Sequence, residues 1–581
     1  MKNYRLTLEH VLYVLALLVA LGYRLIALGA WPLTESEASL AFGAYQLAHG
    51  IPAQIGSLPL AQLGAGWLFR LFTSNEFLAR LIPALAGSLL VLLPYAWRDR
   101  IGRMPAVVLA LGLAIEPSLV AAARTADGPM LAIALLLAAM TAWANCRFSL
   151  AGIALALALL SGPAVWHGLL IVLIAALLLR AFGSDSPSIE SSDLRAAAPA
   201  FGLTLLFAGA WFLRSPQGIA GVGGGLFDFL SGWRMAAGVS VLELLGSWLV
   251  YLPFSLVFGL VALVLLYRRQ DSSFLVYASF TLAAVLVVVF YPGRVALDLV
   301  WVSLPMLLLS AVGLAVVLDW APEDGPVAWA QAGLVFCFLC FAWLDLASLN
   351  GVFDPTQVRL RLIIAAGVFL ITFLATLLIG IGWEFRGALF GLAWGYGLFL
   401  LFYIAGVAWT STHLAERRIY ETWHGQPAMG AQAELLDQLT HFGETNLGYA
   451  KGIDVVFTVD SAALRWTLRD FPQARYEMQL GAGELPTAVI TDAQAEGVFL
   501  QTAYRGESFP WKIHTATFDD DAFPWISWFF RRTAPVSSEP LVLWVRGDAF
   551  PSGSLIQSDG STDVPSQPEE SEDDVVPEVG Q

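Results

Sequence analysis

The sequence predicts an all-α polytopic membrane protein with about thirteen transmembrane helices and a small C-terminal α/β domain. Three observations predict this class. Of the 581 residues, 57% are hydrophobic and 13% are charged, whereas an average soluble domain carries about 25% charged residues. The mean hydropathy is +0.69. Apolar runs of about 20 residues, the length that crosses a bilayer core of about 30 Å, recur along the first two thirds of the chain.

The first predicted span follows Lys2 and Arg5, as the apolar core of a signal peptide would. Because the run is about 20 residues long and many more spans follow, we expect it to be retained as a membrane helix. The fifth and sixth spans are separated only by Gly162 and Pro163. The predicted spans cover residues 11–29, 78–97, 104–122, 129–145, 149–163, 165–181, 197–213, 244–267, 274–291, 296–317, 328–346, 361–382 and 387–409.

The distribution of arginine predicts the orientation. With the N-terminus inside, five of six cytoplasmic loops contain arginine, as the positive-inside rule requires, and the loop at 320–325 is acidic instead. An odd number of spans then puts everything after residue 409 outside. We therefore expect a multi-pass protein of the cell membrane with a cytoplasmic N-terminus and an extracytoplasmic C-terminal domain.

Composition divides the chain into a membrane domain (1–410), an extracytoplasmic α/β domain (411–548) and a disordered acidic tail (549–581). The tail has eight acidic residues and no lysine or arginine, and it supplies much of the net charge of −15. No basic patch interleaved with aromatics is present, so no nucleic-acid partner is predicted. The middle segment alternates helical and strand-like text, with helices over 430–442 and 461–471 and strands over 453–459, 474–479, 487–491 and 541–545.

Two outer loops are long. Within the first, residues 37–50 and 59–72 have the pattern of amphipathic helices that lie in the membrane interface. The second, residues 214–240, is rich in glycine and predicts a mobile loop. Cys337 and Cys340 lie inside an apolar run, where a C-x-x-C pair lacks the water access that redox or metal chemistry needs.

Ionisable side chains near membrane depth are costly, and those of this chain gather on the predicted outer side. Arginines there suit a lipid-linked phosphate, and a nearby carboxylate suits proton abstraction from an acceptor. Simpler interpretations also hold: solvation for Glu35, snorkelling for Arg80 and Arg294, and an i, i+4 pair between Asp298 and Arg294. His167 fits a packed core position better than a metal site. The candidates are Glu35, Glu37, Arg80, Glu116, Arg124, Asp127, Arg294 and Asp298.

Three segments carry a family resemblance. Trp31–Gly50 reads WPLTESEASLAFGAYQLAHG, Phe77–Tyr95 reads FLARLIPALAGSLLVLLPY, and Arg124 and Asp127 follow in the second outer loop. In this order they resemble the protein O-mannosyltransferase and aminoarabinose-transferase superfamily, which has the GT-C fold. The likeness in order, spacing and topology covers residues 1–145. Beyond that it consists of the number of spans and the outer domain.

The resemblance implies an inverting glycosyltransferase that moves a sugar from a polyprenyl-phosphate donor to an extracytoplasmic glycan, lipid or protein. It places the family's loop carboxylate on Glu37, its second-loop aspartate on Asp127 and its second-span arginine on Arg80. The predicted catalytic set is Glu37, Asp127 and Glu35. The predicted phosphate-binding set is Arg80, Arg124 and Arg294, supported by Glu116 and Asp298. No metal ligand is assigned, and dependence on a divalent metal is left open.

One position departs from the family. Ser36 stands where the family has an aspartate before the glutamate. A second hypothesis is therefore a catalytically degenerate scaffold in envelope-glycan assembly. A third is a transporter or flippase, which needs ionisable residues near the bilayer midplane and paired halves. The sequence shows no internal repeat, and its acids lie at one edge.

Overall fold

The computed structural model describes residues 7–182, 190–211, 216–235, 238–271, 273–318, 325–349, 354–413, 419–423, 426–481, 483–493, 502–516 and 523–549. The predicted acidic tail lies outside these ranges except for Ala549.

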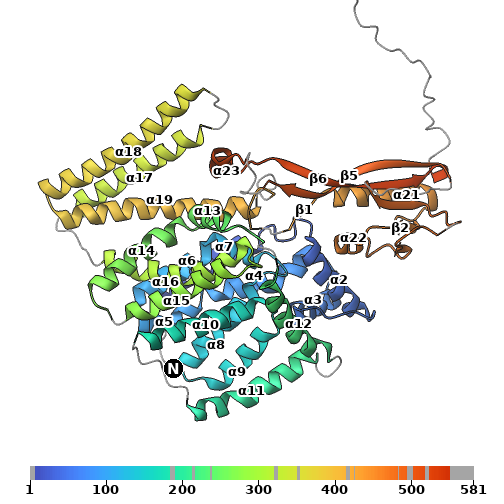
Figure 1. Ribbon diagram of the computed structural model, residues 1–581, viewed down its shortest axis with the longest axis horizontal. Helices are drawn as coiled ribbons and strands as arrows, with labels where there is room; N and C mark the ends of the chain where they lie inside the picture. The colour runs from blue at the N-terminus through green and yellow to red at the C-terminus, as the bar shows by residue number, and fades with distance from the viewer. Residues whose placement is uncertain are drawn as a thin grey trace, which may run out of the picture.

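Helices make up the first 413 residues (Figure 1). They are α1 (Leu8–Leu25), α2 (Glu35–His49), α3 (Pro59–Leu71), α4 (Glu76–Leu90), α5 (Leu93–Ile101), α6 (Arg103–Ile115), α7 (Pro117–Ala123), α8 (Met130–Ala144), α9 (Phe148–Leu159), α10 (Ala164–Ala181), α11 (Ser191–Gly209), α12 (Gln217–Gly232), α13 (Val241–Tyr251), α14 (Pro253–Arg268), α15 (Ser273–Phe290), η1 (Ala296–Asp298), α16 (Leu299–Leu318), α17 (Gly325–Ala347), α18 (Pro355–Gly382) and α19 (Phe385–His413).

Each of the thirteen predicted spans falls on a helix or on two successive helices. Within the described ranges, eight helices are long and apolar enough to cross a membrane, and ten if two bent pairs are counted as spans. The apolar helices α8 and α9 are shorter, with 15 and 12 residues. The chain is thus a multi-pass membrane protein, while its orientation stays a prediction.

The two bent pairs break at prolines. The axes of α6 and α7 meet at 56° before Pro117, and those of α13 and α14 meet at 89° before Pro253. Proline has no N–H to continue the helical hydrogen bonds, and its ring clashes with the preceding turn. The breaks therefore follow directly from the sequence.

The prediction of a mobile loop over residues 214–240 is wrong for residues 217–232, which form helix α12. Its glycines allow close packing that a side chain would prevent. A Cβ at Gly218 would meet the carbonyl oxygen of Gly209, and one at Gly221 would lie 2.8 Å from the carbonyl oxygen of Gly56. Close contact with α11 and the loop before α3 thus compensates for the low helix propensity of glycine.

The C-terminal domain has the predicted α/β composition. A six-stranded mixed sheet has the order β1-β5-β6-β4-β2-β3. The strands β1 and β5 were not predicted. The strands β2, β3, β4 and β6 and the two predicted helices fall where expected, with β6 longer. The elements are β1 (Ala428–Met429), α21 (Gln432–Leu447), β2 (Val455–Phe457), α22 (Ala462–Thr467), β3 (Ala474–Tyr476), β4 (Ala488–Asp492), β5 (Tyr504–Thr515), α23 (Trp525–Arg531), β6 (Val536–Arg546) and η2 (Gly547–Ala549).

This domain packs directly on α2, α3 and α4. In Figure 1, α22 lies between the sheet and α2, over the end of the helical bundle. One hydrophobic core joins residues of α2, α3 and α4 with those of the sheet, and it includes Leu33, Ala41, Trp466 and Ile490, all fully buried. The two predicted domains therefore share a core.

A buried ion pair within the C-terminal domain lies at its second contact with the helical bundle. Arg532, just after α23, lies 3.4 Å from the carboxylate of Glu421. The hydroxyl of Tyr251, at the break between α13 and α14, donates to the same carboxylate. Both charged side chains are almost completely buried. Because water cannot solvate them there, each charge is stabilised by the opposite charge of its partner.

We expect Arg532→Ala to destabilise the protein by about 3–5 kcal/mol, because it leaves Glu421 buried without its cation. The thermal unfolding midpoint in detergent measures this. Lys451→Ala is the control, because its pair with Asp470 is about half exposed and such surface pairs contribute about 0–1 kcal/mol. Equal midpoints for the two variants would contradict the role given to Arg532.

Candidate functional site

A buried ion pair between Arg80 of α4 and Glu37 of α2 lies at the base of the site. Arg80 Nη2 is 2.6 Å from one carboxylate oxygen of Glu37, and Nε is 2.8 Å from the other. The two side chains are 1% and 0% exposed. Two parallel N–H···O bonds of this kind form the strongest geometry that arginine and a carboxylate adopt.

The remaining hydrogen-bonding groups of the pair hold the surrounding loops. Arg80 donates to the carbonyls of Leu28, Trp31 and Pro32, which fixes the loop after α1. Glu37 accepts from the backbone N–H of Thr34, completing a capping box at the start of α2.

Glu37 also accepts from the N–H of Ala126 at 2.9 Å. The structure therefore engages all five N–H groups of Arg80 within the protein, and it leaves Glu37 out of contact with solvent. Their geometry is that of positioning residues rather than of a base and a phosphate ligand.

Glu35 points to the C-terminal domain. Its carboxylate accepts from Ser461 Oγ at 2.5 Å and from the N–H of Ala463 at 3.0 Å, at the N-terminus of α22. A carboxylate there satisfies helix N–H groups that lack partners within the helix. Glu35 thus joins the outer loop to the domain above it.

Asp127 forms no hydrogen bond or ion pair with an arginine of the described ranges, and its side chain is partly exposed. The Ser36 hydroxyl donates to it, and the Ser36 N–H donates to Gln426 Oε1 at 3.1 Å. Burial raises the pKa of Asp127 to about 6, and the nearby Glu37 carboxylate raises it as well, while the Ser36 hydrogen bond acts in the opposite direction. A carboxyl group with such a pKa is a competent general base near neutral pH.

Arg124 lies at the end of α7 and is 6% exposed. Its guanidinium donates to the carbonyls of Tyr23, Ile26 and Ala27, at the C-terminal end of α1. These carbonyls form the negative end of the helix dipole, which attracts a cation. Arg124 therefore joins the same cluster as Arg80 and Asp127.

Arg294 and Asp298 lie in a different place, around the turn η1. The expected ion pair between them is absent: Arg294 donates to the carbonyls of Val289 and Tyr291, and Asp298 accepts from the N–H of Val295. In the described part of the chain, Nε of Arg294 is buried without a partner. His167 packs against the Tyr291 ring, as the packed-core interpretation predicts.

Glu116 lies at the break between α6 and α7 and is completely buried. Neither carboxylate oxygen has a hydrogen-bond partner among the described residues. Glu116 therefore forms no hydrogen bond to the other predicted site residues within the described ranges, and we assign it no contact in the site.

An apolar cavity runs between α4, α5, α6, α8, α10, α15 and α16. Its lining includes Trp97, Met140, Gly168, Phe280 and Trp301. Gly168 follows His167 directly, and the His167 ring packs against Tyr291 outside the lining of the cavity. A cavity so lined accepts a hydrocarbon chain.

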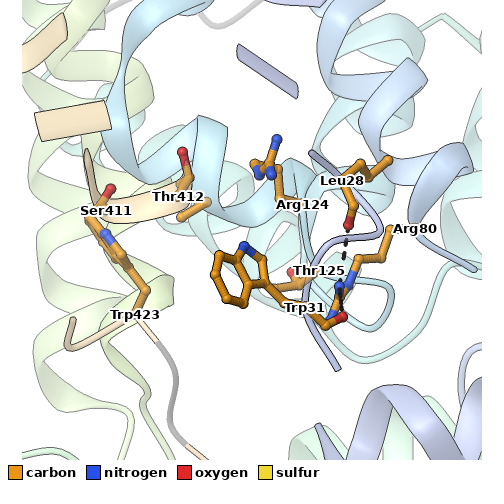
Figure 2. Close-up of a pocket in the computed structure, with 9 residues that line it drawn as sticks. Leu28, Trp31, Arg80, Arg124, Thr125, Ser411, Thr412 and Trp423 are labelled. Carbon is orange, nitrogen blue, oxygen red and sulfur yellow. Dashed lines mark hydrogen bonds between the residues drawn. The ribbon is translucent and has the colours of Figure 1, made fainter. Parts of the chain in front are cut away.

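Sequence reasoning missed the side chains that line a smaller cleft next to Arg124. Ser411 and Thr412 come from the end of α19 and Trp423 from the following segment, and they face Trp31 and Thr125 (Figure 2). A cluster of hydroxyls in Thr410–Thr412, at the end of the last span, was the available signal. Among the described residues there is no group of three or more His, Cys, Asp or Glu arranged to hold a metal ion.

No protein-family model and no curated protein matches the chain. Among solved structures, it is similar to ArnT from Cupriavidus metallidurans bound to undecaprenyl phosphate, with a TM-score of 0.51 and 16% identity over 83% of this chain and 93% of that one. The fold is GT-C. The archaeal oligosaccharyltransferase AglB from Archaeoglobus fulgidus, in complex with an inhibitory peptide and a dolichol-phosphate, is similar at a TM-score of 0.43, with 14% identity over 83% and 69% of the two chains, a likeness too low to argue from.

The Arg80–Glu37 pair joins α4 to α2. We expect Arg80→Ala to lower stability by about 3–5 kcal/mol, since it leaves a buried carboxylate unpaired. Arg80→Lys keeps the charge but loses the paired N–H geometry, so we expect an intermediate loss. Thermal unfolding of the purified protein measures both. A midpoint for Arg80→Ala equal to that of the unmodified chain would refute the structural role.

Asp127 gives a pH dependence to stability. Its pKa of about 6 in the fold lies above the ordinary value of 3.8. The protonated form is therefore favoured by folding, and the resulting stability is present below about pH 4 and is lost as the pH rises through about 6. Relative to Asp127→Asn, the unfolding midpoint of the unmodified protein should fall over this range. A constant difference between the two proteins would contradict the assignment.

Proposed function

We propose that the protein is a membrane glycosyltransferase that moves a sugar from a polyprenyl-phosphate donor to an extracytoplasmic acceptor with inversion. The observation that carries the proposal is the likeness in fold, over 83% of the chain, to a protein whose structure holds undecaprenyl phosphate. The partly exposed carboxyl of Asp127 beside buried arginines supplies the chemistry that such a reaction needs.

In this proposal Asp127 is the general base. It accepts the proton of an acceptor hydroxyl or amine while that oxygen or nitrogen forms a bond to the anomeric carbon. The bond between the anomeric carbon and the phosphate oxygen breaks, and its electron pair leaves with the polyprenyl phosphate. One displacement inverts the anomeric configuration. Ser36, through its hydrogen bond, and Glu37, through the N–H of Ala126, position the loop that carries Asp127.

The apolar cavity and Arg294 suit the donor lipid. An isoprenoid tail fits a cavity lined by hydrocarbon. The phosphate would then bind at Arg294, whose buried Nε has no partner among the described residues and which lies just before η1 and α16, the latter a helix that lines the cavity. A guanidinium there stabilises the charge that develops on the leaving phosphate. Helix α7 contacts both η1 and α8, so the segment carrying Asp127 adjoins this region.

A catalytically silent scaffold is the second candidate, because one observation favours it. The glutamate that the family resemblance assigns to catalysis is sealed in the Arg80 ion pair, and Ser36 replaces the preceding acid. A scaffold keeps these buried contacts for stability alone. It therefore predicts that Asp127 can be replaced without a functional consequence in cells.

We expect Asp127→Asn to reduce sugar transfer by about 10²–10⁴-fold, because an amide cannot accept the proton. For the unmodified protein, the rate should rise with pH through about 6 as Asp127 loses its proton. The assay uses vesicles with a radiolabelled polyprenyl-phosphate sugar and a lipid or glycan acceptor mixture.

Asp470→Asn, on the exposed pair with Lys451, is the matched control and should leave transfer unchanged. Full turnover in the Asp127→Asn variant would exclude Asp127 as the base. Transfer absent from the unmodified protein with every polyprenyl-phosphate sugar tested would favour the scaffold.

A further inference from the structure

The apolar cavity extends along helix α15, away from Arg294. Val276 and Phe280, in the first two turns of α15, belong to its lining, whereas Tyr291 and Arg294 follow the end of the same helix. An α-helix rises 1.5 Å per residue, so Val276 lies about 22 Å from Tyr291. Part of the cavity is therefore remote from the place proposed for the donor phosphate.

This remote part of the cavity is also the more exposed one. Val276 is 39% exposed, and Ile101, the last residue of α5, is half-buried. Near the beginnings of α10 and α16, in contrast, Gly168 and Trp301 are buried. A Cβ on Gly168 would lie 2.7 Å from the Trp301 ring, so these two residues leave no space between them. The mouth of the cavity therefore lies between the end of α5 and the beginning of α15.

Exposed arginines flank this mouth on both sides. Arg100 and Arg103 lie at the turn between α5 and α6, and Arg268 and Arg269 lie just before α15. Within the described ranges, neither Arg100 nor Arg103 forms an ion pair with a carboxylate, and Arg100 donates to the end of α8 instead. Two guanidinium groups beside Ile101 thus keep their positive charge uncompensated.

The acidic residues near the mouth compensate little of this charge. Asp99 lies 3.8 Å from Arg98, which already has a cation's share of partners in Glu9 at 4.0 Å. Asp271 accepts from the N–H of Ser273 at 2.8 Å, at the beginning of α15. A positive rim around an apolar opening suits a molecule with an anionic headgroup and a hydrocarbon chain.

The cavity of the unloaded protein requires an apolar occupant. A void lined by hydrocarbon stays dry, and an empty one forfeits the dispersion contacts of its lining. The indole N–H of Trp97 is already satisfied by the hydroxyl of Thr141 at 2.8 Å within the lining. The volume of about 280 Å³ accommodates part of one hydrocarbon chain, so a headgroup attached to that chain stays outside, beside the arginines.

We propose that, when no donor is bound, the cavity holds one acyl chain of an anionic glycerophospholipid, with its headgroup beside Arg100 and Arg103. The chain enters between α5 and α15 from the leaflet at this end of the bundle, which lies away from the C-terminal sheet (Figure 1). A donor tail that fills the same cavity displaces this lipid. The inference requires no sugar transfer, so it stands or falls separately from the proposed function.

The test measures the binding of two lipids with identical acyl chains to the full-length protein in detergent. Phosphatidylglycerol is anionic, and phosphatidylcholine carries no net charge. Val276→Trp narrows the mouth at an exposed position, and Val264→Trp is its matched control, because Val264 is 53% exposed on α14 outside the lining. Arg103→Gln removes one charge from the rim, and Arg195→Gln, at an exposed arginine of α11, is its control. Thermal unfolding midpoints check that all four variants are folded.

We expect the unmodified protein to bind one phosphatidylglycerol per chain, about tenfold more tightly than phosphatidylcholine. Val276→Trp should weaken both lipids about tenfold, the effect of about two methylene groups that are no longer buried. Arg103→Gln should weaken phosphatidylglycerol alone by about fivefold, the contribution of one arginine near a membrane surface. Both control variants should bind like the unmodified protein.

Three outcomes would overturn the proposal. The first is equal binding of the two lipids by the unmodified protein. The second is unchanged binding of phosphatidylglycerol in Val276→Trp or in Arg103→Gln. The third is a loss of the same size in the matched control, because lipids that merely surround the bundle would respond to either exposed position.

Discussion

The buried pair of Arg80 and Glu37 is the constraint on which the outer end of the protein depends. A guanidinium and a carboxylate removed from water at this depth are tolerable only because each satisfies the other and because the remaining N–H groups of Arg80 reach backbone carbonyls. The pair fixes the loop after α1 and the start of α2. It also reaches Ala126, so the position of Asp127 is set from the same point.

The site combines rigid contacts with a few unused groups. Glu35, Ser36 and Glu37 are consecutive, yet each bonds to a different part of the protein. Their partners are the N-terminus of α22, Asp127 and Arg80 of α4, in that order. What remains for chemistry is a partly exposed carboxyl, and what remains for binding is the buried Nε of Arg294, which has no partner among the described residues. This division between framework and free groups is the pattern expected of a preorganised site.

The sequence alone predicted much of the architecture and less of the site. Helices α2 and α3 were predictable because their apolar periodicity is local, and β2 and β4 because they are short, buried apolar runs. Helix α12 was missed because its glycines signal a loop unless the close approach of Gly209 and Gly56 is known. Strand β5 was missed because Gly506 and Pro510 interrupt its alternation. Arg80 and Glu37 lie 43 positions apart in the chain. Local sequence patterns do not reveal which of the distant charged side chains pair with each other.

The cap that Glu35 places on α22 also bears on biogenesis. Its partner Ser461 lies 426 residues later in the chain, so the outer loop is inserted long before the helix it caps has been made. Until that part of the chain has been made, the side of α2 that packs against α22 is uncovered, although α3 already covers another side. A chain that terminates early would therefore expose an apolar surface on α2. Cellular quality-control proteases recognise unfinished proteins by exposed surfaces of this kind.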